Sequence, residues 1–143
     1  LTDGGRVVLS VWQALQHHPI YEALFEATAR HLGAAISDVA LPFSLWDAAE
    51  LRALLSDAGF QHIEVTPRLL DIHLPSPERF VQLTVLGAAT SIPAFAQLDT
   101  AARSALVHAV TDETEAVAQR YREGDKLTFP MSTHIAVAYS VRR

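Results

Sequence analysis

The chain opens with Leu1-Thr2-Asp3-Gly4-Gly5-Arg6-Val7-Val8-Leu9-Ser10-Val11-Trp12, and this segment gives the first indication of the fold. A Gly-Gly turn leads into a strand, Val7 to Trp12, that is apolar on both faces apart from Ser10. This pattern is typical of strands that are covered on both sides, as in α/β sheets. We therefore expect an α/β protein in which this strand comes first.

Four helices are predicted from the helical spacing of apolar residues and from end signals. The first begins at Pro19, a favoured first helical residue, and ends at Gly33. The next three follow Asp47, Ser76 and Asp99, whose side chains can accept hydrogen bonds from the free amides of a helix start.

Two further extended segments complete the predicted elements. The first runs from His62 to Leu74 and is interrupted or bent at Pro67, which suits a strand at the edge of a sheet. The last strand, Leu127 to Val141, alternates large side chains with small ones. This alternation predicts a central strand with a helix lying close to its small-residue face. An antiparallel pairing uses up both segments together, so we expect them to pair.

Composition excludes several classes of function. The chain has 143 residues, half of them apolar, which suits one domain, residues 1–143, with a sizeable core. It has no apolar run of the ~18 residues that a membrane span needs, and it has no cysteine for disulfides or thiolate metal sites. The net charge of −5 argues against a nucleic-acid partner. We expect a soluble, cytoplasmic protein that binds neither nucleic acid nor membrane.

Four segments resemble, in the same order, the C-terminal half of class I S-adenosylmethionine-dependent methyltransferases, in particular the UbiE-like or type 11 small-molecule branch. Asp3 to Trp12 is similar to the turn into strand five of that family, and Phe43 to Phe60 to the helix before strand six. Pro75 to Val81 resembles the next helix start, and Gly124 to Met131 the approach to strand seven. The resemblance implies a Rossmann-like sheet in the order five, seven, six, with strand seven antiparallel.

The resemblance also implies S-adenosylmethionine as the cofactor of the parent enzyme and a small molecule as methyl acceptor. The cofactor signature of such folds is a Gly-rich turn that follows a strand and opens a helix, whereas Gly4-Gly5 precedes a strand. We therefore assign no residue to the cofactor. The cofactor-binding half is expected to lie outside these residues, and the chain alone to bind no cofactor and to be inactive. A non-enzymatic binding or dimerisation module is the alternative.

Candidate acceptor-binding residues follow from the place where open α/β sheets bind ligands, the carboxyl ends of their strands. They are Trp12, His17, Tyr21, Phe43 and Trp46. Methyl transfer needs alignment of the reactants and sometimes a base, so no universal catalytic motif is expected, and no catalytic residue is assigned. His17 or its neighbour His18 is a candidate base or acceptor contact, but an exposed histidine at a helix start is the favoured interpretation of both. For Trp12, the alternative to acceptor binding is a packing role in the core.

Two other chemistries find little support. None of the histidine pairs has the four-residue spacing that places two ligands on one helix face, so no metal is expected. No Gly-x-Ser-x-Gly turn of a serine hydrolase is present either.

In the parent fold the strand Val7 to Trp12 pairs with a preceding strand. Without that preceding strand, the apolar edge of Val7 to Trp12 would be exposed, and such an edge favours self-association. We therefore expect a homo-oligomer that forms through this strand.

Overall fold

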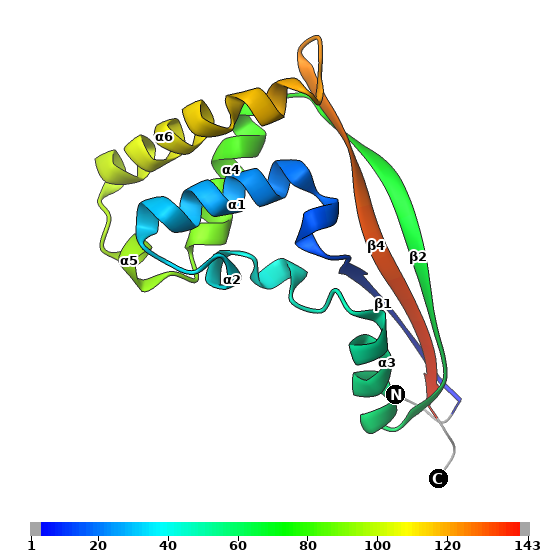
Figure 1. Ribbon diagram of the computed structural model, residues 1–143. Coiled ribbons are helices and arrows are strands. Elements are labelled where there is room, and N and C mark those ends of the chain that lie inside the picture. The colour runs from blue at the N-terminus through cyan, green and yellow to red at the C-terminus, as the bar shows by residue number, and fades with distance from the viewer. Residues whose placement is uncertain (1–3, 141–143) are drawn as a thin grey trace. The chain divides into compact units, whose positions relative to one another are not determined.

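The structure is a computed structural model, and it describes residues 4–140 (Figure 1). Its elements are, in chain order, β1 (Arg6–Trp12), α1 (Pro19–Leu32), α2 (Ile36–Val39), α3 (Ala48–Asp57), β2 (Phe60–Leu74), α4 (Pro77–Ala89), α5 (Pro93–Ala96), α6 (Thr100–Gln119), β3 (Arg122–Glu123) and β4 (Lys126–Ser140). Short 3₁₀ turns occupy Leu15–His17 and Leu41–Phe43. The mixed α/β class predicted from the sequence is confirmed.

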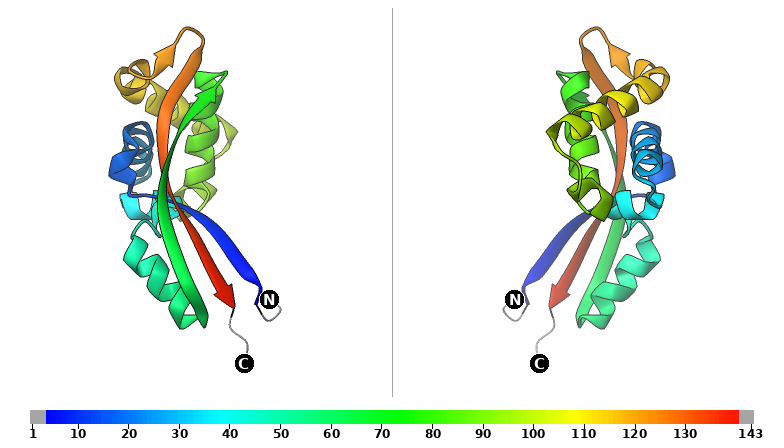
Figure 2. Two further views of the ribbon diagram at one scale, coloured as in Figure 1. Left: turned by 90° about the vertical axis from the view of Figure 1, so that its right-hand side faces the viewer. Right: turned by 90° about the vertical axis from the view of Figure 1, so that its left-hand side faces the viewer.

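The strands form one sheet in the order β1-β4-β2, with the short β3 paired to β4. β1 and β4 are antiparallel, with Val7 opposite Ala138 and Val11 opposite His134. The last strand is therefore central, as its alternation of large and small residues predicted. Figure 2 shows the carboxyl-terminal part of β4 between β1 and β2.

The chain divides into two compact units. The first, which we call the sheet unit, comprises Leu1–His17, Pro42–Leu70 and Met131–Arg143. The second, the helical unit, comprises His18–Leu41 and Asp71–Pro130 and contains α1, α2, α4, α5 and α6. Each unit is described separately below.

The core of the sheet unit lies between α3 and one face of the sheet. Leu51 and Leu55 of α3 pack against Ala136 and Ala138 of β4. Side chains from β1 and β2 extend this cluster, namely Val7, Val11, Phe60, Ile63 and Val65. This packing confirms the prediction that a helix lies against the small-residue face of the last strand. The small alanine side chains let the helix approach the strand closely.

Two expectations about the strands need correction. The apolar pattern of β1 predicted burial on both faces, yet Val8 is 55% exposed and Leu9 37% exposed. Val7 and Val11 pack against the α3 cluster, whereas side chains alternate along a strand, so Val8 belongs to the opposite face. β1 also lies at the end of the strand order, so only β4 pairs with it among the described strands. The second correction concerns β2, which continues through Pro67 without interruption. An end strand tolerates proline because one row of its amides needs no partner in the sheet.

The helical unit is built on contacts of α1 with α4 and α6 and of α4 with α6. Its buried side chains include Leu24, Val85, Val110 and Phe129. The predicted caps are present: the Ser76 hydroxyl accepts a hydrogen bond from the Arg79 amide at 3.3 Å, and Asp99 accepts one from the Ala102 amide at 2.8 Å. In the sheet unit, Asp47 likewise accepts a hydrogen bond from the Ala49 amide at 2.7 Å.

Residues 4–140 contain six α-helices, whereas about four were expected. The two additional helices, α2 and α5, are single turns of four residues. Such a length carries no apolar periodicity, which explains why the sequence pattern did not predict them. Among the described residues, none of the helices combines the length and apolar character needed to cross a bilayer.

Candidate functional site

Two of the predicted site residues stack on each other in the sheet unit. Trp12 is the last residue of β1 and Phe43 ends the second 3₁₀ turn. Their ring centroids lie 6.3 Å apart and their planes are inclined by 28°. Phe43 is only 4% exposed, whereas Trp12 is 37% exposed. The pair thus places an accessible aromatic surface at the carboxyl end of β1.

A hydrogen-bond network connects His17 to the same end of β1. The Gln13 side-chain amide donates to the Thr133 carbonyl at 3.1 Å, and the Gln13 backbone amide donates to the Ser132 carbonyl at 3.0 Å. His17 Nδ1 lies 3.2 Å from Gln13 Oε1. Thr133 is held in turn, because its hydroxyl donates to the Val11 carbonyl at 2.7 Å. β4 thereby fixes the position of the exposed His17 ring through Gln13.

This network also fixes the tautomer of neutral His17. A carbonyl oxygen can only accept, so the Gln13 amide nitrogen must face Thr133 and its oxygen must face His17. His17 Nδ1 therefore carries the proton and donates it to Gln13. The other ring nitrogen, Nε2, then has a lone pair with which it can accept a proton. The geometry thus leaves Nε2 as the acceptor nitrogen of the neutral ring.

Tyr21 belongs to the helical unit, where it is part of an aromatic cluster. Its ring centroid lies 5.8 Å from that of Phe25, 5.5 Å from that of Phe80 and 6.0 Å from that of Phe129, each in edge-on geometry. Tyr121 joins the cluster through Phe129, at 6.3 Å. Burial raises the pKa of the Tyr21 phenol above its ordinary value, so this hydroxyl stays protonated at neutral pH.

Trp46 and His18 take different positions. Trp46 lies in the segment before α3 and is 51% exposed. His18 was grouped with His17 as an exposed histidine at a helix start, and this expectation is wrong for His18. It occupies the cap position of α1, its backbone carbonyl accepts a hydrogen bond from the Glu22 amide at 2.9 Å, and its side chain is buried.

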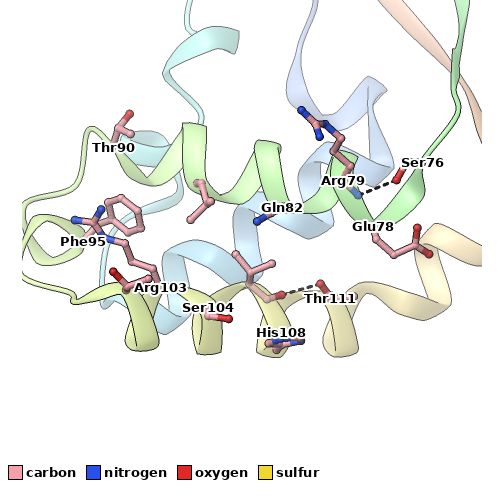
Figure 3. Close-up of a pocket in the computed structure, with 13 residues that line it drawn as sticks. Ser76, Glu78, Arg79, Gln82, Thr90, Phe95, Arg103, Ser104, His108 and Thr111 are labelled. Atoms are coloured by element: carbon pink, nitrogen blue, oxygen red, sulfur yellow. Dashed lines mark hydrogen bonds between the residues drawn. The ribbon is translucent and has the colours of Figure 1, made fainter.

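One feature of the helical unit was not predicted from the sequence, a groove of about 970 Å³ between α4 and α6 (Figure 3). Basic and polar side chains line it, among them Arg79, Gln82, Arg103 and His108. No spacing motif connects these residues, since they lie on two helices whose packing brings them together. Within residues 4–140 there is no group of three or more histidine, aspartate or glutamate side chains arranged to hold a metal ion.

No protein-family model matches the chain. A comparison with curated proteins likewise finds no significant match. The candidate function therefore depends on the residues and the geometry described above.

Proposed function

We propose that this chain is the acceptor-binding part of a cytoplasmic, S-adenosylmethionine-dependent methyltransferase that acts on a small molecule. The observation that carries the proposal is the strand order β1-β4-β2 with β4 antiparallel to β1. This is the order that the resemblance implies for strands five, seven and six. The exposed Trp12 ring at the carboxyl end of β1 supports it further, because ligands bind at this edge of open α/β sheets.

The cofactor itself is proposed to bind outside the described residues. Gly4 precedes β1, so it does not form the turn after a strand that would hold the cofactor. When bound to the parent enzyme, S-adenosylmethionine supplies an electrophilic methyl group. The contribution of this chain is to hold and orient the acceptor.

In this proposal the acceptor lies against Trp12, with Trp46 as a second aromatic contact. The Trp12–Phe43 stack orients the first ring, and a flat or apolar acceptor gains binding energy by packing on it. His17 Nε2 takes the proton that a hydroxyl acceptor loses as its oxygen attacks the methyl group, or that an amine acceptor loses once its nitrogen is methylated. Gln13 holds the imidazole in the tautomer that this step requires.

The test is an enzymatic assay of the protein that contains this chain together with its cofactor-binding half. Transfer of a radiolabelled methyl group from S-adenosylmethionine is measured to phenols, amines and carboxylic acids. His17→Asn should lower kcat with little change in the acceptor KM, and added imidazole should restore part of the rate. Absence of transfer to every acceptor would refute the proposed function. Unchanged kcat in the variant would refute the role of His17.

The exposed edge of β1 favours a second candidate, a dimerisation module. Two copies of β1 can pair antiparallel about a two-fold axis at Leu9, which places Val7 opposite the partner's Val11. Arg6 then lies opposite the partner's Trp12, where a cation–π contact can form. The only charged side chain of the strand thereby meets an aromatic ring rather than a like charge. Measurement of the oligomeric state, described in the Discussion, tests this alternative.

A further inference from the structure

The groove between α4 and α6 of the helical unit combines an apolar floor with a basic rim. Leu86 of α4, Phe95 of α5 and Val107 of α6 contribute the apolar surface. Figure 3 shows Arg103 rising from α6 beside the Phe95 ring and Gln82 reaching from α4 toward the space between the helices. The groove volume of about 970 Å³ lies in the range of small-molecule sites.

The Arg103 side chain is held in position, but its Nε donor has no hydrogen-bond partner within residues 4–140. Its guanidinium carbon lies 4.6 Å from the centroid of the Phe95 ring, so the planar group packs over the aromatic face. Its Nε atom is buried and has no hydrogen-bond partner among the described residues. A buried donor without an acceptor is costly, which makes a missing acceptor the simplest explanation for this arrangement.

The charge around the groove favours an anionic ligand. Within residues 4–140, neither Arg79 nor Arg103 forms an ion pair. The one acidic side chain of the rim, Glu78, already faces Arg122 at 3.5 Å. Two guanidinium groups therefore remain uncompensated in a protein whose net charge is −5. Such a local excess of positive charge attracts anions.

We propose that this groove binds a small organic acid whose carboxylate pairs with Arg103 and whose apolar body lies on Leu86 and Val107. A guanidinium fork matches a carboxylate in geometry, and the stacking on Phe95 orients the fork before the ligand arrives. The apolar floor favours an organic acid over inorganic phosphate, which has no apolar part. This site belongs to the helical unit and is independent of the methyltransferase proposal.

The test is a titration of the 143-residue protein with 2-naphthoate, followed by two-dimensional NMR of the backbone amides. The neutral analogue 2-naphthylmethanol serves as the ligand control. We expect shifts for Gln82, Ser104 and His108, which line the groove, and weaker binding of the alcohol. Arg103→Gln should weaken naphthoate binding about tenfold to a hundredfold, as expected for the loss of a charged hydrogen-bonding partner.

A matched control is Arg120→Gln, since Arg120 follows the same helix, is exposed and does not line the groove. This variant should bind naphthoate like the wild type. Equal weakening in both variants, equal affinity for acid and alcohol, or shifts confined to the sheet unit would overturn the proposal. Competition by inorganic phosphate at the same concentration as naphthoate would overturn it as well.

A second variant keeps the test valid if Arg103→Gln perturbs folding. Ser104 is exposed on α6 and lines the groove, and glutamate is well tolerated in helices. Ser104→Glu adds a negative charge to the rim, so it should weaken the binding of naphthoate and leave that of naphthylmethanol unchanged. Wild-type affinity of this variant for naphthoate would contradict the proposal.

Discussion

The stack of Trp12 on Phe43 should be measurable as a coupling energy. We consider the variants Trp12→Leu and Phe43→Leu and the double variant, which remove either ring or both while keeping apolar bulk. With ring centroids 6.3 Å apart and planes inclined by 28°, the pair lies within the range of favourable aromatic contacts. Such contacts contribute about 0.5–1.5 kcal/mol beyond the burial of area.

This coupling energy is smaller than the loss of unfolding free energy that each single substitution by alanine would cause. Phe43 is 4% exposed, so Phe43→Ala would cost about 3–5 kcal/mol. Trp12 is 37% exposed and loses roughly two thirds of that, about 2–3 kcal/mol on truncation to alanine. A chain of 143 residues has a free energy of unfolding on the order of 7–20 kcal/mol. Leucine variants are therefore preferred, because they keep the protein folded.

The free energies of unfolding come from urea titrations followed by far-ultraviolet circular dichroism. The double variant should be less destabilised than the sum of the single variants by about 0.5–1.5 kcal/mol. The control pair is Trp12→Leu with Leu55→Val, because Leu55 belongs to the α3 core cluster and Trp12 does not. This pair should be additive within about 0.5 kcal/mol. Additivity of the Trp12–Phe43 pair would refute the stack as an energetic unit of the site.

Three further predictions follow from exposed side chains. Trp46→Ala should change the free energy of unfolding by no more than about 0.5 kcal/mol, since Trp46 is 51% exposed. In the proposed complete enzyme this variant should raise the acceptor KM and leave cofactor affinity unchanged. Equal loss of acceptor and cofactor affinity would mean that Trp46 has a structural role. Hydrogen bonds from Arg30 and then His31 lower the pKa of Glu113 below its ordinary 4.5, so the stability that this carboxylate contributes is present above pH 4.5 and is lost as the pH falls through the lowered pKa. Acid titrations of stability should be flatter in that window for Glu113→Gln, and superimposable curves would contradict the assignment. Light scattering at micromolar concentration should show a dimer that Val8→Lys shifts toward monomer, whereas a monomeric wild type would rule out association through β1.

Features that depend on local sequence were predicted well. Asp47, Ser76 and Asp99 cap α3, α4 and α6 as expected, because a cap bond joins residues two or three positions apart. The alternation of large and small residues in the last strand, with Ala136 and Ala138 among the small ones, correctly predicted that this strand is central and which of its faces packs against a helix.

Features that depend on distant segments were not predicted. Arg103 meets Phe95 only because the chain turns between α5 and α6, and the groove exists only because of how α4 packs on α6. Helix patterns do not specify the angle at which two helices cross, so no reading of one helix predicts such a groove. The role of Gln13 in fixing the His17 tautomer likewise needs Thr133, which is 120 residues away.

The central claim that we propose is that this chain is the acceptor side of a methyltransferase whose cofactor-binding half lies outside these 143 residues. Calorimetric titration with S-adenosylhomocysteine tests this claim in two proteins: residues 1–143 alone, and an extended protein in which this chain is joined to the proposed cofactor-binding half. We predict no heat of binding for the 143 residues and a micromolar dissociation constant for the extended protein. Micromolar binding by residues 1–143 alone, or no binding by the extended protein, would contradict the account.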